Sequence, residues 1–331
     1  YGENGGPGGL FHSLRQIPPI IEICEDINLI CPDAVVFNFS NPMQRICHAV
    51  TTKFPDLRFI GLCHEIKSMN RQLPDLMETE MHNIEYRAAG LNHLSILLEA
   101  RYKNTGKDGY PIIKQNFDAY FSDLVNKHDA KPSKPGAERG VFRKLFKTYG
   151  YLPITTDSHL GEYIQWAYSV ADHDAILDFY DNYKEKCLAF YDNKTSYDHY
   201  FDLNNLDTHE RVVPIIEGIL SDSAYEEPAI NIPNNGYIEC LPKDIVVEVP
   251  GIINKSGISG ISFKNYPAAF GSLLNSQSGV IQMTTDAVLN ASKHSAYLAL
   301  LADPVVNDSY QAEKLLNNML ETQGKFLYYL K

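Results

Sequence analysis

The N-terminal part of the chain holds two polar clusters and a histidine whose side chains could bind a metal ion or a sugar. Asn38-Phe39-Ser40-Asn41-Pro42 and Cys63-His64-Glu65 each follow a short apolar run, and His93 lies in a third. In open α/β sheets, ligands gather beyond the carboxyl ends of parallel strands. A thiolate and an imidazole at one such edge would form an open metal site with room for substrate oxygens and water. The alternatives are a helix-starting turn at Asn41-Pro42, a buried thiol at Cys63 and a core histidine at His93.

The run Gly5-Gly6-Pro7-Gly8-Gly9 has the composition of a phosphate-binding loop. It lacks a preceding strand, and its spacing matches neither the dinucleotide-binding nor the P-loop pattern. We therefore expect no nucleotide site there. The chain begins with Tyr1 and not with methionine, and we expect it to be a fragment of a longer product.

An alternation of helices and strands positions these side chains. Apolar periodicity separates the two element types, and Pro42 suits the first turn of a helix because its missing N–H would have no partner there. The order predicts an α/β fold with a largely parallel sheet. The expected elements are a helix at 18–31, a strand at 33–39, a helix at 42–52, a strand at 58–62, a helix at 66–80 and an extended segment at 83–98.

Residues 101–331 predict a second domain, which is mainly helical α+β. Helical patterns dominate over 116–222 and are interrupted by a basic, proline-bearing loop at 128–139. The pattern at 225–250 is extended around Pro233-Asn234-Asn235-Gly236, where Asn-Gly predicts a tight turn. Long helices are expected to close the chain.

Composition excludes several classes of protein. The net charge of −12 argues against a nucleic-acid partner, which would need clustered Lys and Arg. No apolar run is long enough to span a membrane, and no signal peptide is visible, so we expect a cytoplasmic protein. The six cysteines lack the dense spacing of a disulfide scaffold, and we expect most to be reduced core residues.

Several segments together resemble glycoside hydrolase family 4. The resemblance covers nearly the whole chain, and the paired segments Gly-Leu-Cys-His-Glu and Gly-Leu-Asn-His are its most specific part. The matching segments are Gly8-Gly9 through Pro18, 38–42, 61–66, Ala89-Gly90-Leu91-Asn92-His93, 157–163 and 231–250.

The resemblance implies an NAD-dependent glycosidase that departs from the usual two-carboxylate mechanism. In this family NAD oxidises the sugar C3 hydroxyl, the C2 proton is abstracted, the aglycone leaves, and water addition and reduction follow. A ketone at C3 acidifies the C2 hydrogen, and a metal can stabilise the enolate. By resemblance, residues 1–100 are the C-terminal part of a Rossmann-like NAD-binding domain, similar to that of lactate and malate dehydrogenases. Residues 101–331 then form the substrate, metal and oligomerisation domain.

The family pattern also assigns roles to residues of this chain. It implies that Cys63 and His93 hold a divalent metal, commonly manganese, and that Asn41 lies between nicotinamide and substrate. Asn38 or Ser40 is expected to assist Asn41 in cofactor binding, and Asn92 is expected to contribute to substrate binding. For the base at C2 the family uses an aspartate or a tyrosine from the segment matched by 157–163. We select Asp157, with Tyr163 second; the alternative is that Asp157 caps the helix that contains Tyr163.

The residues after Cys63 bear on the substrate. His64 takes the place of an aspartate that is the leaving-group acid in the phosphosugar-cleaving subgroup, and it could donate a proton or bind a hydroxyl. Cys63-His64-Glu65-Ile66 resembles the Cys-His-Glu-Val form of α-galacturonidases. Glu65 is expected to orient a substrate hydroxyl or a basic group. The candidates for that basic group are Arg45, Lys67 and Arg139.

These residues predict an α-galacturonidase that acts on a small uronic acid glycoside. The alternatives are an α-galactosidase or α-glucosidase of the same family, a lactate- or malate-type dehydrogenase that needs no metal, and an inactive sugar-binding fragment. We expect a homodimer or homotetramer, assembled through the closing helices.

Overall fold

The computed structural model describes residues 3–127, 139–192 and 211–331. Residues 1–2, the part of the expected basic loop at 128–138 and the part of the expected helical region at 193–210 lie outside the described residues. Among the described helices, none is both long and apolar enough to cross a membrane.

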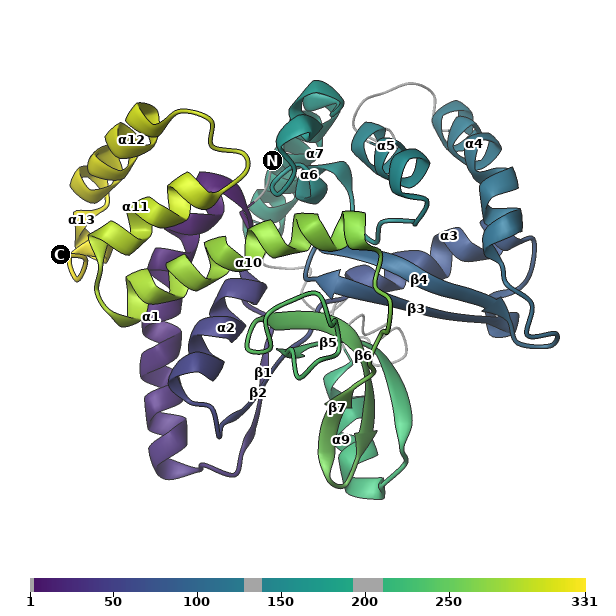
Figure 1. Ribbon diagram of the computed structural model, residues 1–331, viewed down its shortest axis with the longest axis horizontal. Helices are drawn as coiled ribbons and strands as arrows, with labels where there is room; N and C mark the ends of the chain where they lie inside the picture. Colours follow the sequence, from purple (N-terminus) through teal and green to yellow (C-terminus); the bar gives the residue numbers. More distant parts are fainter. Residues whose placement is uncertain (1–2, 128–138, 193–210) are drawn as a thin grey trace.

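A seven-stranded sheet forms the centre of the described structure (Figure 1). Its order is β1-β2-β5-β6-β3-β4, and β7 pairs with β6. The α/β class is confirmed, but the expectation of a largely parallel sheet is wrong. Among the strands of the described residues, only β1 and β2 pair in parallel, and every other strand pair of the sheet is antiparallel. The strands are β1 (Val35–Asn38), β2 (Arg58–Gly61), β3 (Ile84–Leu91), β4 (Leu94–Tyr102), β5 (Tyr225–Pro233), β6 (Val246–Asn254) and β7 (Gly257–Gly260).

Helices connect and cover the strands. In the first half they are α1 (Gly6–Ile30), α2 (Met43–Lys53), the 3-10 turn η1 (Glu65–Lys67), α3 (Ser68–Met77), η2 (Met81–Asn83), α4 (Tyr110–Lys127), α5 (Gly140–Tyr149) and α6 (Asp157–Leu160). The second half contains η3 (Gln165–Ser169), α7 (His173–Asp192), α9 (Val212–Ser221), α10 (Ala268–Leu289), α11 (Lys293–Ala302), α12 (Ser309–Thr322) and α13 (Gly324–Leu327). The long closing helices are thus confirmed.

Helix α1 begins at Gly6, earlier than periodicity predicted, and continues through two internal prolines. Proline removes a helical hydrogen bond and normally kinks a helix. Here the buried face formed by Leu10, Leu14, Ile17 and Ile21 supplies the packing that favours a continuous helix.

Three apolar clusters hold the layers together. Helices α1 and α2 pack beside β1 and β2, while α10 lies across the molecule and α11 to α13 gather beside the N-terminal half of α1 (Figure 1). The largest cluster joins β3 and β4 to α3, α4 and α5, and it extends through β5 and β6 to α10. The sheet therefore draws strands from both predicted domains, and the domain boundary at residue 100 stays a prediction.

Two expected local structures differ from the structure. The extended segment at 83–98 is a hairpin, because Asn92 and His93 form a two-residue turn between β3 and β4, with His93 at φ 60°. The predicted tight turn at 233–236 is part of a longer loop at 234–245. The buried Asn234 side chain organises that loop by donating to the carbonyls of Ile238, Leu241 and Pro242.

Candidate functional site

The structure brings Cys63 and His93 together, as the sequence predicted. Cys63 follows β2, and His93 stands at the tip of the β3–β4 hairpin, so the sheet edge places both side chains at one point. Cys63 Sγ lies 3.4 Å from His93 Nε2. The other ring nitrogen, Nδ1, lies 3.2 Å from Asn4 Nδ2. His93 is thus held by polar contacts on both nitrogens, with Nε2 facing the thiol.

A buried carboxylate lies behind this pair. Burial, and next the negative charge of Glu248, raise the pKa of Cys63 well above its ordinary value. A thiol in such a place stays protonated until a cation displaces its proton. Glu248 accepts hydrogen bonds from Asn92 Nδ2 at 2.8 Å, Ser95 Oγ at 2.7 Å and Asn231 Nδ2 at 3.3 Å.

Asn92 fixes the hairpin turn. Its side chain is buried and donates to Glu248, while its backbone N–H donates to Gln44 Oε1 at 2.9 Å. These contacts hold the backbone from which His93 projects. The expected contact of Asn92 with substrate stays a prediction.

A third histidine, which the sequence analysis did not select, belongs to the same group. The ring of His159 lies against that of His93, with centroids 4.1 Å apart and an angle of 35° between the ring planes. One possible ligand atom from each of Glu65, His93 and His159 lies within 4.8 Å of the others, so these residues could hold a metal ion. His159 and Glu162 are three residues apart, and that helical spacing was the available sequence signal.

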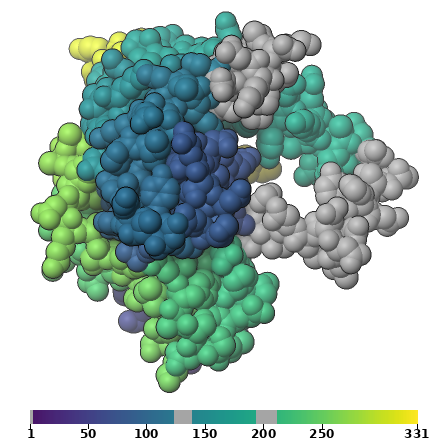
Figure 2. Space-filling model, turned by 90° about the vertical axis from the view of Figure 1, so that its right-hand side faces the viewer, coloured from purple at the N-terminus to yellow at the C-terminus, as the bar shows by residue number. Residues whose placement is uncertain are grey.

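A pocket opens in front of the histidines. Figure 2 shows the surface hollowed between the blue segment that contains η1 and α3 and the teal helix α7. Three aromatic side chains of α7 that were not predicted, Phe179, Tyr180 and Tyr183, line it; such flat apolar faces suit contact with a sugar ring. The remaining lining residues are Glu3, Phe39, Asn41, Met43, Leu62, Cys63, His64, Glu65, His93 and His159.

Asn38 is the last residue of β1 and Asn41 follows that strand, and the two side chains have different surroundings. Asn41 lines the pocket, and its Nδ2 lies 3.5 Å from Glu3 Oε1. Asn38 is buried and turned into its own loop, where Nδ2 donates to the Ser40 carbonyl at 3.0 Å and Oδ1 accepts from the Ser40 N–H. Of the two, Asn41 is therefore the one placed to touch a cofactor or substrate.

Asp157 and Tyr163, the two candidates for the base, do not appear among the described residues that line this pocket. The fully buried Asp157 carboxylate accepts from the backbone N–H groups of Val141 and Phe142, both at 2.8 Å. Asp157 therefore caps α5, and not the helix that the capping alternative named. Burial, and next the neighbouring Glu162, raise the pKa of Tyr163 well above its ordinary value, while Arg45 opposes the rise. Their roles as base stay predictions.

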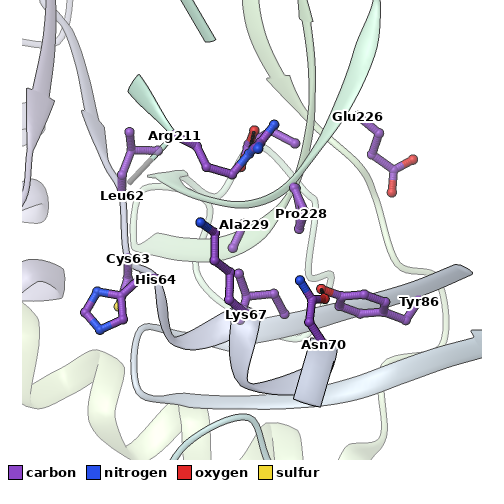
Figure 3. A pocket seen from close by; sticks show the side chains of 12 residues that line it. Leu62, Cys63, His64, Lys67, Asn70, Tyr86, Arg211, Glu226, Pro228 and Ala229 are labelled. Carbon is purple, nitrogen blue, oxygen red and sulfur yellow. Dashed lines mark hydrogen bonds and ion pairs between the residues drawn. The ribbon is translucent and has the colours of Figure 1, made fainter. Parts of the chain in front are cut away.

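A second pocket adjoins Cys63 on the other side of His64. Figure 3 shows Lys67 extending from η1 into it, with Arg211 on the opposite wall. Arg211 forms a close ion pair with the buried Glu227, at 2.9 Å. Of the three basic candidates for the sugar C6 end, only Lys67 lines this pocket. Arg45 is buried near Asp303, and Arg139 donates to the Thr155 carbonyl.

Comparisons with known proteins agree on one family over most of the chain. The sequence model described as family 4 glycosyl hydrolase matches residues 1–79, and that of its C-terminal domain matches 88–306. An α-glucosidase of Erwinia rhapontici is 44% identical over all of this chain and 76% of its own length. An α-galacturonidase of Thermoanaerobacterium saccharolyticum is 29% identical over 98% of this chain and 73% of its own.

Solved structures share the fold. A 6-phospho-α-glucosidase from gut microorganisms, in complex with NAD and Mn²⁺, has a TM-score of 0.79 at 21% identity, covering 98% of this chain and 74% of its own. A 6-phospho-β-glucosidase of Thermotoga maritima, with manganese, NAD⁺ and glucose-6-phosphate, has a TM-score of 0.72 at 21% identity over the same shares.

Proposed function

Since the chain belongs to glycosyl hydrolase family 4, we propose that it is an α-glucosidase that uses NAD and a divalent metal, manganese by preference. The observation that carries the choice of sugar is the 44% identity to an α-glucosidase over the whole chain, against 29% for an α-galacturonidase. The tetrapeptide Cys63-His64-Glu65-Ile66 had favoured the galacturonidase, but it is a short match beside an identity that spans the chain.

Charge in the pocket supports a neutral sugar. Glu3 and Glu65 both line the pocket in front of His93. Like charges within a few ångströms repel, so a uronate placed between two carboxylates would be bound less well than a glucose. This argument concerns the half of the site that faces the histidines.

The residues of the site fit a divalent cation. Cys63 Sγ lies 3.4 Å from His93 Nε2, and one possible ligand atom from each of Glu65, His93 and His159 lies within 4.8 Å of the others. The Glu65 carboxylate is the kind of hard oxygen donor that suits manganese. Cys63 and His93 would hold the ion, and Asn41 would stand next to the nicotinamide. When bound, NAD supplies the hydride acceptor at sugar C3, and the metal polarises the C2 and C3 oxygens.

The chain's own residues then bind and orient the sugar. The aromatic side chains of α7 offer apolar faces, and Asn41 offers an amide for a hydroxyl. His64 lines both pockets and is the candidate donor of a proton to the departing aglycone oxygen. For the base at C2, Tyr163 and Asp157 remain the candidates.

A paired assay tests the substrate. The purified chain, with NAD, Mn²⁺ and a reductant, is given nitrophenyl α-glucoside, α-galactoside and α-galacturonide at equal concentrations. We expect the glucoside to have the highest kcat/KM, and the released glucose to carry deuterium at C2 when the reaction runs in heavy water. Cleavage without C2 deuterium would overturn the elimination mechanism, and steady accumulation of NADH would indicate a simple dehydrogenase.

An α-galacturonidase is the second candidate. The tetrapeptide after β2 favours it, and so does the pocket that contains Lys67 and Arg211, since a cationic wall can bind a C6 carboxylate. Faster cleavage of the galacturonide in the same assay would replace the first proposal by this one. Substitution Lys67→Met should then raise KM for the galacturonide and leave KM for the glucoside almost unchanged.

A further inference from the structure

Glu162 is a buried carboxylate that no assigned role in catalysis explains. It is 2% exposed and lies just after α6. Its Oε2 accepts hydrogen bonds from the backbone N–H groups of Asn4 and Gly5, both at 2.6 Å, and its Oε1 lies 2.9 Å from His159 Nδ1. Consecutive N–H groups directed at one anion form a concave anion-binding loop. The glycine-rich segment at the N-terminal end of the described chain thus binds a carboxylate of the protein itself.

The glycine at position 5 is required by this contact. A Cβ added there would lie 2.6 Å from the Glu162 backbone oxygen and 2.7 Å from its Cβ. The segment therefore approaches Glu162 more closely than any larger residue would allow.

The carboxylate orients His159. An ionised carboxylate only accepts, so the neutral tautomer of His159 that suits this contact donates from Nδ1 and carries its lone pair on Nε2. Among the described residues, Nε2 receives no hydrogen bond, and the ring lies against that of His93. A histidine that donates one ring nitrogen to a carboxylate and presents the other to its neighbours is the usual arrangement of a metal ligand with its supporting group.

We propose that His159 and Glu65 are metal ligands in addition to Cys63 and His93, and that Glu162 positions His159. This inference rests on the metal dependence contained in the proposed function. The ligand atoms of Glu65, His93 and His159 already lie within 4.8 Å of one another. Manganese favours oxygen donors over thiolate, so Glu65 supplies the hard donor that a Cys–His pair lacks.

As a metal ligand, Glu65 has a different role from the one expected from the sequence. A carboxylate engaged with the metal is not available to orient a substrate hydroxyl or a basic group. The glutamate of the Cys-His-Glu sequence is then explained by metal binding, and it does not indicate whether the substrate is charged. This interpretation agrees with a neutral glucoside as substrate.

Metal binding, measured without turnover, tests the inference. Free Mn²⁺ is titrated by electron paramagnetic resonance into the wild-type chain and into His159→Ala, Glu65→Gln and Glu162→Gln. The loss of a group that supports a ligand typically weakens metal affinity by about 10- to 100-fold, so we expect Kd to rise by that factor in Glu162→Gln and by at least as much in the two variants that lack a proposed ligand. His82→Ala, at an exposed position on η2, is the matched control, and its Kd should equal that of the wild type.

Cobalt gives a second readout. In the Co²⁺-loaded chain, Cys63→Ser should remove the thiolate-to-cobalt absorption band. His159→Ala should keep that band and change the visible d–d bands. Thermal unfolding of the metal-free variants shows whether each is folded, and His159→Asn, with a smaller polar side chain, replaces the alanine variant if that one is not.

The outcomes separate the inference from the proposed function. If the wild type binds Mn²⁺ and both His159 variants bind it equally well with unchanged cobalt spectra, the inference is wrong and the proposed function stands. If the wild type binds no Mn²⁺, the metal dependence and the inference fail together.

Discussion

Replacing Asp157 by alanine distinguishes a helix cap from a catalytic base. Its carboxylate accepts from the N–H groups of Val141 and Phe142 in the first turn of α5, at 2.8 Å each, and all three residues are buried. A hydrogen bond to a charged group contributes about 1.5 to 3 kcal/mol, so the loss of two costs roughly 3 to 6 kcal/mol. Burial raises the pKa of Asp157, which shows that the folded state disfavours the charge and offsets part of this cost.

We expect a net loss of about 3 kcal/mol in the free energy of unfolding. An unfolding entropy of about 2.1 cal/mol/K per residue gives about 0.7 kcal/mol/K for the 331-residue chain, so Tm should fall by about 4 °C. The matched control is Asp172→Ala. Asp172 accepts from the Ala175 N–H at 3.0 Å at the exposed start of α7, where a cap contributes about 1 kcal/mol.

Scanning calorimetry of both variants is paired with glucoside cleavage measured well below the lower Tm. Under the capping interpretation, Asp157→Ala loses stability, and at low temperature it keeps solvent deuterium uptake at sugar C2. An unchanged Tm together with the loss of that uptake would refute the reasoning and make Asp157 the base.

Two further predictions concern the packing and the thiols. Gly5→Ala should lower the free energy of unfolding by about 2 kcal/mol, because the added carbon would overpack against Glu162. The control Gly279→Ala lies on the exposed face of α10 with no atom within 4 Å of the added carbon, and it should raise the free energy of unfolding by up to about 1 kcal/mol. Equal changes of the two variants in urea unfolding would contradict this prediction. Burial raises the pKa of Cys47 to about 12, so almost no thiolate of this residue forms at pH 8. After iodoacetamide treatment of the folded chain, peptide mapping should find the exposed Cys31 alkylated and Cys47 unmodified.

The approach of Cys63 to His93 could be predicted from the sequence, but the way it is achieved could not. The alternation of elements correctly placed Cys63 at the end of a strand, but it placed His93 near the middle of an extended segment. The hairpin was missed because a turn formed by Asn92 and His93 lacks the glycine that usually marks such turns. The long apolar segment around it was therefore interpreted as one extended strand.

The partners of Asp157 and Glu162 were beyond the reach of sequence patterns. Each carboxylate binds backbone N–H groups that belong to a distant segment, and backbone groups leave no residue-specific trace in a sequence. His159 differs, because it lies three residues before Glu162 on one turn. A histidine and a glutamate at that spacing are a pattern that the sequence does contain.

The backbone conformation of His93 costs folding stability at a position where the side chain is expected to bind a ligand. At φ 60° a non-glycine residue carries strain of about 1 to 2 kcal/mol, which glycine would avoid, and Asn-Gly is the preferred pair for a two-residue hairpin. A library of variants at this position that is selected for heat resistance alone should therefore enrich glycine. The same library selected for capture of Mn²⁺ should retain histidine, so the two winning sequences would differ at the residue that faces Cys63.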